Sequence, residues 1–325
     1  MKRVFLLLLL TCSLFIAPAA AAGGSGTAAD PYIIQTAAEL QSIQNNLAAY
    51  YKLANDINLQ GVSFTPIGSQ STPFIGSFDG AGHTISNLVI SSSTQFAGLF
   101  SCLGSGATVK DVTFQDCSVS ASSWCGVVIG KIVMSSSAHK TAVISNVDCV
   151  RCSASASGSN IGCLVGMIRV SAVVEIVNCD VSYSITESAS GTSIGCLVGV
   201  CGESSSLVID SSTVQNCIVS GSNIGCLVGV CYEATSVNAL NCDVMNCLAK
   251  GGDHIGGLYG INWGGSFSAS DCTVTGCTIV ATRYYAGGIA GRISSGNLGI
   301  FSGCSVTDST IIAPNYAAGI CPAYS

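Results

Sequence analysis

Charge is the scarcest property of this sequence. Only 9% of its 325 residues are Asp, Glu, Lys or Arg, whereas about 25% is usual for a soluble domain. The formal net charge is −6, and it becomes −8 when Lys2 and Arg3 are left out. No basic run or patch occurs, which argues against a nucleic acid or an anionic lipid surface as partner.

Long apolar runs are also missing beyond residue 16. A helix that crosses a bilayer needs about 18 or more apolar residues in succession, so the sequence predicts no transmembrane segment after removal of the leader. Hydrophobic residues nevertheless make up 49% of the chain, which excludes disorder. They come in short pieces separated by Gly, Ser, Asn and Thr, a spacing typical of strands.

The first 22 residues have the pattern of a secretory signal peptide. Lys2 and Arg3 are followed by the apolar segment 4–16 and by small residues over 17–22. This order of a positive, an apolar and a small-residue region predicts cleavage near residues 20–22. We therefore expect the protein to be secreted or displayed on the cell surface.

Groups that carry catalysis or bind metals are few. The histidines are His83, His139 and His254, and none has the spacing of a zinc site. Cys149-x-x-Cys152 stands alone, without a second pair at zinc-finger distance. No glycine-rich turn opens a helix in the manner of a nucleotide site. We expect no catalytic residue, no metal and no cofactor.

A short repeat dominates the sequence. Ile-Gly-Cys-Leu-Val-Gly occupies residues 161–166 and returns unchanged at 194–199 and 224–229. Weaker copies stand at 125–130, 255–260 and 286–291, and further copies at 96–101 and 317–322. Taken at their second positions (Ala97 in the first copy), the copies are 29 to 36 residues apart. The repeat glycines are Gly162, Gly166, Gly195, Gly199, Gly225, Gly229, Gly256, Gly260, Gly287 and Gly291.

This period predicts an all-β solenoid. A unit of about 30 residues is too short for a propeller blade and fits one turn of a parallel β-helix, with each hexapeptide as a strand. Thr36 and Glu39 form a capping box, followed by a predicted amphipathic helix over 37–49 that would cap the first coil. The expected divisions are 1–22, signal peptide; 23–35, linker and first strand; 36–95, capping helix and first coils; and 96–325, repeats. Ser135–Lys140 should bulge from a corner.

Cysteines are abundant, with 18 remaining when Cys12 is left out. They recur at three phases of the repeat, where they would stack: Cys163, Cys196 and Cys226; Cys149, Cys179, Cys242, Cys272 and Cys304; and Cys217, Cys247 and Cys277. Stacked side chains on parallel strands point the same way, which is poor disulfide geometry. The pattern favours buried thiols, with bridges such as Cys149–Cys152 or Cys196–Cys201 as the alternative.

Three features together resemble the GLUG-motif family of exported bacterial and archaeal surface proteins. They are residues 24–32, the Phe-Asp-Gly-Ala-Gly-His block at 78–83, and the repeats, of which Gly-Gly-Leu-Tyr-Gly at 256–260 is the cleanest. The resemblance implies a right-handed β-helix in an adhesin-like surface protein. Cysteine replaces the family's second glycine after Gly162, Gly195 and Gly225.

The residue before each repeat suggests a ligand surface. These positions read Trp124, Asn160, Ser193, Asn223, His254, Tyr285 and Tyr316. Arg283, Tyr284, Tyr285 and Tyr316 could therefore gather near the C-terminal end and contact a surface glycan or a protein. The alternative is that the rings only stiffen a corner.

The functional prediction is a non-catalytic surface module for adhesion, binding or structure. Repetition offers a long face on which weak contacts can add up. One alternative is a carbohydrate-active enzyme, a lyase or glycosidase, which paired carboxylates in a groove would favour. Another is a rod that self-associates through an uncapped C-terminal coil.

Overall fold

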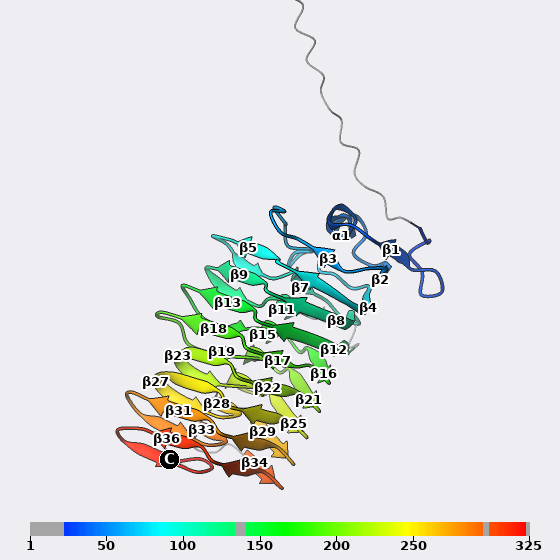
Figure 1. Cartoon of the computed structure of the whole chain (residues 1–325). Coiled ribbons are helices and arrows are strands. Elements are labelled where there is room, and N and C mark those ends of the chain that lie inside the picture. Colours follow the sequence, from blue (N-terminus) through cyan, green and yellow to red (C-terminus); the bar gives the residue numbers. More distant parts are fainter. Residues whose placement is uncertain (1–22, 134–140, 295–298, 323–325) are drawn as a thin grey trace, which may run out of the picture.

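The chain winds into a β-solenoid in the computed structural model, which describes residues 23–133, 141–294 and 299–322 (Figure 1). Strands of successive coils stack in parallel along its length, which confirms the predicted all-β fold. The predicted signal peptide, the expected bulge at Ser135–Lys140 and His139 lie outside the described residues. Within them, no helix is long and apolar enough to cross a membrane.

Three parallel sheets make up the wall of the solenoid. The first contains β1 (Tyr32–Ile34), β2 (Tyr50–Leu53), β3 (Ile57–Asn58), β4 (Ser77–Ser86), β8 (Thr108–Gln115), β12 (Ala142–Val150), β16 (Val173–Val177), β17 (Val181–Ser182), β21 (Ser206–Asp210), β22 (Thr213–Gln215), β25 (Ser236–Leu240), β26 (Asp243–Met245), β29 (Ser266–Ser270), β30 (Thr273–Thr275), β34 (Gly299–Ser302) and β35 (Ser305–Thr307). The second contains β5 (Val89–Ser91), β6 (Gln95–Ala97), β9 (Ser118–Ala121), β10 (Ser123–Cys125), β13 (Ser153–Ala156), β14 (Ile161–Gly162), β18 (Ile185–Ser188), β19 (Ile194–Gly195), β23 (Ile218–Gly225), β27 (Leu248–Gly256), β31 (Thr278–Ala281), β32 (Tyr285–Gly287), β36 (Thr310–Ile312) and β37 (Tyr316–Ala318). The third contains β7 (Phe100–Leu103), β11 (Ile129–Val133), β15 (Val165–Arg169), β20 (Val198–Cys201), β24 (Val228–Cys231), β28 (Tyr259–Asn262) and β33 (Ala290–Ile293).

Equivalent residues of successive repeats pair in register on neighbouring coils, as the period predicts. In the first sheet Val208 pairs with Asn238, and Asn238 pairs with Ser268. The copy at 96–101 is the exception, because Ala97 pairs with Cys125 rather than with Gly126. That copy is therefore shifted by one residue from its predicted alignment.

The hexapeptides are corners, not the strands that the sequence suggested. In the copy at 161–166, β14 ends at Gly162 and β15 begins at Val165, with a bend between them. The glycines let two stretches of backbone meet directly: a Cβ on Gly162 would lie 2.9 Å from the amide nitrogen of Gly199. Real Cβ atoms do not come so close to backbone, so these positions require glycine.

Two further corners of each coil use residues with positive φ. The first corner contains Asp111, Asn146, Asn178, Ser211, Asn241, Asp271 and Gly303, and the second contains Asn87, Asp116, Arg151, Tyr183, Asn216, Asn246, Gly276 and Asp308. Asn and Asp tolerate this left-handed conformation better than most residues. At the first corner the amide of Asn146 donates to Asp111 Oδ1 over 2.7 Å, and the amide of Asn178 donates to Asn146 Oδ1 over 2.8 Å.

The cysteines stack in rows, but Cys149 is in a different row from the predicted one. It pairs with Phe114 and Val181, not with the position of Cys179. The coil that starts at Cys149 contains more than thirty residues, whereas Cys179 comes thirty residues after Cys149. Equal spacing therefore assigns Cys149 to the wrong row. The strand registers give three long rows: Val127, Cys163, Cys196, Cys226 and Gly257; Val147, Cys179, Ser212, Cys242, Cys272 and Cys304; and Cys117, Cys152, Ser184, Cys217, Cys247, Cys277 and Ser309. Cys201 and Cys231 pair in a separate row on the third sheet.

The thiols serve as hydrogen-bonding groups inside the corners. The amide of Cys247 donates to Cys277 Sγ over 3.4 Å, and Cys277 Sγ faces the carbonyl oxygens of Val244 and Thr275 at 3.6 and 3.4 Å. Serine does the same where it replaces cysteine, since Ser309 Oγ accepts the amide of Cys277 over 3.1 Å. Cysteine therefore fills the core and satisfies buried backbone at once.

All cysteines of the described residues are thiols, and all but Cys304 and Cys321 are buried. Burial raises the pKa of Cys125 and of Cys201 to about 12. These two thiols therefore stay protonated at neutral pH and unreactive. The proposed bridges Cys149–Cys152 and Cys196–Cys201 stay predictions for the exported protein.

A short helix lies at the N-terminal end of the solenoid, where the cap was predicted (Figure 1). Thr36 and Glu39 form the expected capping box. The helix is shorter than the predicted 37–49, because α1 (Ala37–Ser42) passes into the 3-10 turn η1 (Ile43–Asn45). Asn45 and Asn46 are weak helix formers, and Tyr51 fixes the turn by donating its hydroxyl to the Asn46 carbonyl over 2.7 Å.

Candidate functional site

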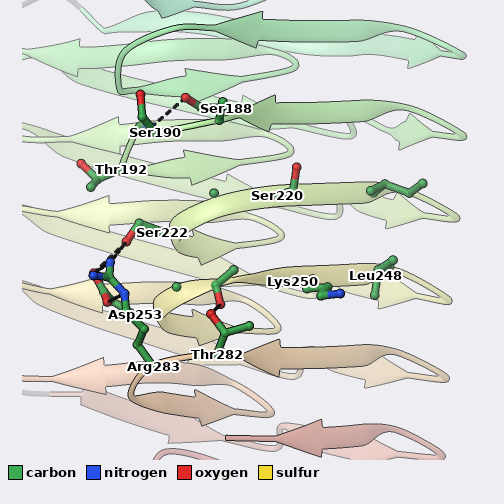
Figure 2. A pocket seen from close by; sticks show the side chains of 16 residues that line it. Ser188, Ser190, Thr192, Ser220, Ser222, Leu248, Lys250, Asp253, Thr282 and Arg283 are labelled. Carbon is green, nitrogen blue, oxygen red and sulfur yellow. Dashed lines mark hydrogen bonds and ion pairs between the residues drawn. The ribbon is translucent and has the colours of Figure 1, made fainter.

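A groove of about 680 Å³ crosses successive coils of the second sheet, over β23 and β27 and over the segments that follow β18 and β31 (Figure 2). We call it the hydroxyl groove, because serine and threonine dominate its polar lining. Its polar side chains are Ser188, Ser190, Thr192, Ser220, Ser222, Lys250, Asp253, Thr282 and Arg283. Gly221 and Gly251, in the same lining, leave backbone exposed between these side chains.

Arg283 is fixed at one end of the hydroxyl groove. Its Nε lies 2.8 Å from Asp253 Oδ1, and its Nη2 donates to Asp253 Oδ2 over 2.8 Å. Ser222 donates to the same carboxylate over 2.7 Å. Figure 2 shows these three side chains meeting, with Lys250 apart from them. Among the described residues Lys250 has no ion-pair partner, so the groove keeps one uncompensated positive charge in a chain of net charge −6.

The structure brings the predicted tyrosines together as a stack. Tyr285 lies between His254 and Tyr316, with ring centroids 5.4 and 5.2 Å away and planes within 8° of parallel. Tyr284 lies 6.2 Å from Tyr285. Arg283 does not join this stack, since its guanidinium turns into the hydroxyl groove instead.

The stack belongs to a row that runs along successive coils from Phe96 to Tyr316. This corner row comprises Phe96, Trp124, Asn160, Ser193, Asn223, His254, Tyr285 and Tyr316. A small apolar cluster apart from the main core lies close by on the third sheet and consists of Met167, Val200, Val230 and Ile261. Cations stand beyond both ends of that cluster. Lys131 Nζ lies 4.9 Å from the Phe96 ring centroid, and the Arg292 guanidinium lies 5.4 Å from that of Tyr285.

His254 is the histidine of the corner row. Its Nδ1 lies 2.8 Å from Asn223 Oδ1. Burial first, and then the charge of Arg292, lower its pKa from 6.5 to about 4. The ring is therefore neutral at physiological pH, which suits its parallel stacking on Tyr285.

The lowered pKa of His254 predicts a loss of stability in mild acid. Between pH 6.5 and 4 the unfolded chain binds a proton at this residue that the folded chain does not bind, so the free energy of unfolding falls as pH falls through this range. We expect the free energy of unfolding to fall by about 2 kcal/mol. This is less than the full pKa shift corresponds to, because the ring keeps some contact with solvent. Urea unfolding at pH 7 and pH 4.5 measures it. His254→Asn, which repeats Asn223, should reduce that difference, and an unchanged difference would contradict the assignment.

The sequence predicted that the tyrosines gather, but it did not predict that Arg283 binds Asp253. Asp253 lies thirty residues before Arg283, close to one period, so the repeat itself carried the signal. Lys250 and the hydroxyl groove were missed because the groove forms only when the turns of successive coils stack. Among the described residues, no group of three or more His, Cys, Asp or Glu side chains is arranged to hold a metal ion.

Comparisons with known proteins reveal partial likeness only. No family model matches the chain. It is 42% identical over 120 residues to halomucin of Haloquadratum walsbyi, a match that covers 33% of this chain and 1% of that protein. It is 33% identical over 101 residues to a candidate Gly-rich membrane protein of Evansella cellulosilytica, covering 28% of this chain and 12% of that one. By their names these relatives are of surface or membrane type.

A solved structure supports the fold. The crystal structure of a candidate immunoglobulin A1 protease from Bacteroides ovatus aligns with a TM-score of 0.62 over 93% of this chain and 86% of that chain. The two are 18% identical, so the likeness concerns the solenoid fold alone.

Proposed function

We propose that this chain is a non-catalytic binding module of a secreted or cell-surface protein, and that its hydroxyl groove takes an acidic glycan. The observation that carries the proposal is Lys250, which has no ion-pair partner in the described part of the chain and lies in a groove lined by hydroxyl groups. Hydroxyls bind sugar hydroxyls, and an ammonium binds a carboxylate or sulfate group. Similarity to halomucin and to a Gly-rich membrane protein supports a surface location. Membership of the GLUG-motif family is part of this proposal.

The geometry of the groove supports binding over catalysis. Its carboxylate, Asp253, accepts from Arg283 and Ser222 and is held by them. A carboxylate that acts as a general base or nucleophile must instead face the substrate. The lining comes from successive coils, whose strands are about 4.8 Å apart, so an extended chain of sugars can contact several coils at once.

Lys250→Ala tests this proposal. Binding of the mature protein to an array of carboxylated, sulfated and neutral glycans should show a preference for the acidic ones, and the variant should lose about 10-fold in affinity. The preference should weaken with added salt. Lys52→Ala, a change of an exposed lysine on β2, is the matched control and should bind normally. Equal binding by both variants, or no binding to the array, would refute the proposal.

A further inference from the structure

A second groove lies at another corner, where the chain passes from the third sheet to the first. It has a volume of about 740 Å³ and is lined by the turns that follow β15, β20, β24 and β28. We call it the Tyr–Trp groove, after the two aromatic residues in its lining. The side chains that matter for binding are Glu203, Tyr232, Glu233 and Trp263.

Tyr232 and Trp263 occupy equivalent positions one coil apart. Tyr232 follows Cys231 and Trp263 follows Asn262 in the sequence, and Cys231 pairs with Asn262 in the parallel sheet. Their exposed fractions are 42% and 43%, large for aromatic side chains that have packing partners nearby. Both rings therefore keep surface available to a ligand.

The packing around the two rings holds them in place. A Cβ at Gly202 would lie 3.4 Å from the Tyr232 ring, so this ring rests against bare backbone. The Trp263 ring lies 5.9 Å from the Arg292 guanidinium and meets the His254 ring edge-on at 6.2 Å. Rings fixed in this way lose little conformational entropy when a ligand covers them.

Two carboxylates lie beside the rings, also one coil apart. Glu203 forms an ion pair with Arg169. Glu233 has no ion-pair partner among the described residues, and its Cγ would lie 2.7 Å from a Cβ placed on Gly264. Gly264 therefore makes room for the Glu233 side chain, which brings one uncompensated carboxylate to the groove.

We propose that the Tyr–Trp groove binds a neutral pyranose oligosaccharide. Aromatic faces accept the C–H face of a sugar ring, and a carboxylate accepts hydrogen bonds from two neighbouring hydroxyls. The negative charge of Glu233 repels acidic sugars, so this groove selects a ligand class different from that of the hydroxyl groove. The inference rests on this corner alone and does not depend on the proposed function of the hydroxyl groove.

Tryptophan fluorescence gives a direct test, because the chain has only Trp124 and Trp263. In Trp124→Phe the emission comes from Trp263 alone. Titration with neutral hexasaccharides of glucose, N-acetylglucosamine and mannose should shift this emission and saturate with at least one of them. Titration with choline, as a cationic probe, should leave it unchanged.

Binding variants use residues that the same row already contains. Gly202 occupies the position of Tyr232 in the coil before it, and Ser294 occupies the position of Trp263 in the coil after it. Tyr232→Gly and Trp263→Ser should therefore fold normally. Affinity for the hexasaccharide, measured calorimetrically, should fall by at least about 10-fold in each. Lys250→Ala should leave it unchanged.

Four results would overturn the inference. They are no saturable response to any hexasaccharide, an affinity in the two groove variants equal to that of the native protein, a response to choline in place of sugar, and release of new reducing ends from the hexasaccharide. The last would make Glu203 and Glu233 a hydrolytic pair, and Glu233→Gln should then abolish that release.

Discussion

Gly225→Ala is expected to lower the free energy of unfolding by about 3–5 kcal/mol. A Cβ at this position would lie 2.5 Å from the Leu258 carbonyl oxygen and 2.6 Å from the Gly260 amide nitrogen. Both atoms are backbone of the neighbouring coil, which is itself hydrogen-bonded, so neither can move aside cheaply. Urea unfolding of the mature protein measures the loss, with soluble yield as a second readout.

Gly319→Ala is the matched control for this change. A Cβ on Gly319 meets nothing within 4 Å, so stability should stay within about 0.5 kcal/mol of the native protein. If Gly225→Ala were as stable as Gly319→Ala, the corner would not be held by backbone contact, and the structural role of the repeat glycines would be wrong.

Cys277→Val is expected to cost about 2–3 kcal/mol, whereas Cys277→Ser should cost about 1 kcal/mol or less. Valine fills similar space but removes the acceptor for the buried amide of Cys247. Serine keeps an acceptor, as Ser184 does for the amide of Cys152 over 3.0 Å. Thermal and urea unfolding under reducing conditions compare the two variants.

The order of these two variants is the decisive outcome for the cysteine rows. If Cys277→Val were the more stable, the cysteines would act as small hydrophobic residues only. The native protein could prove equally stable with and without reductant while the Cys277→Ser variant fails to fold. That result would contradict a hydrogen-bonding role shared by thiol and hydroxyl.

The sequence predicts the stacking of coils well because the period is nearly constant from Gly195 onward. It fails where coils differ in length. Cys149 and Cys179 look equivalent from spacing, but the strand register sets Cys149 against Val181. Hydrophobic letters also could not distinguish a strand from a corner, because every residue of Ile161–Gly166 is buried.

The sites could be predicted only in part, for a geometric reason. The tyrosine stack follows from equal phase, since Tyr285 and Tyr316 are thirty-one residues apart. Tyr232 and Trp263 are also thirty-one residues apart, yet they lie in turns whose conformations no periodic pattern specifies. The direction in which a turn side chain leans depends on its packing, such as the bare backbone of Gly202 under Tyr232.

Amide-to-amide nuclear Overhauser effects in a perdeuterated sample test the parallel stack most directly. The account predicts contacts between strands thirty residues apart, at Val208–Asn238 and again at Asn238–Ser268, since parallel neighbours lie about 4.8 Å apart. Contacts that instead join each strand to the next strand in sequence, running in opposite directions, would contradict the solenoid and both grooves built on it.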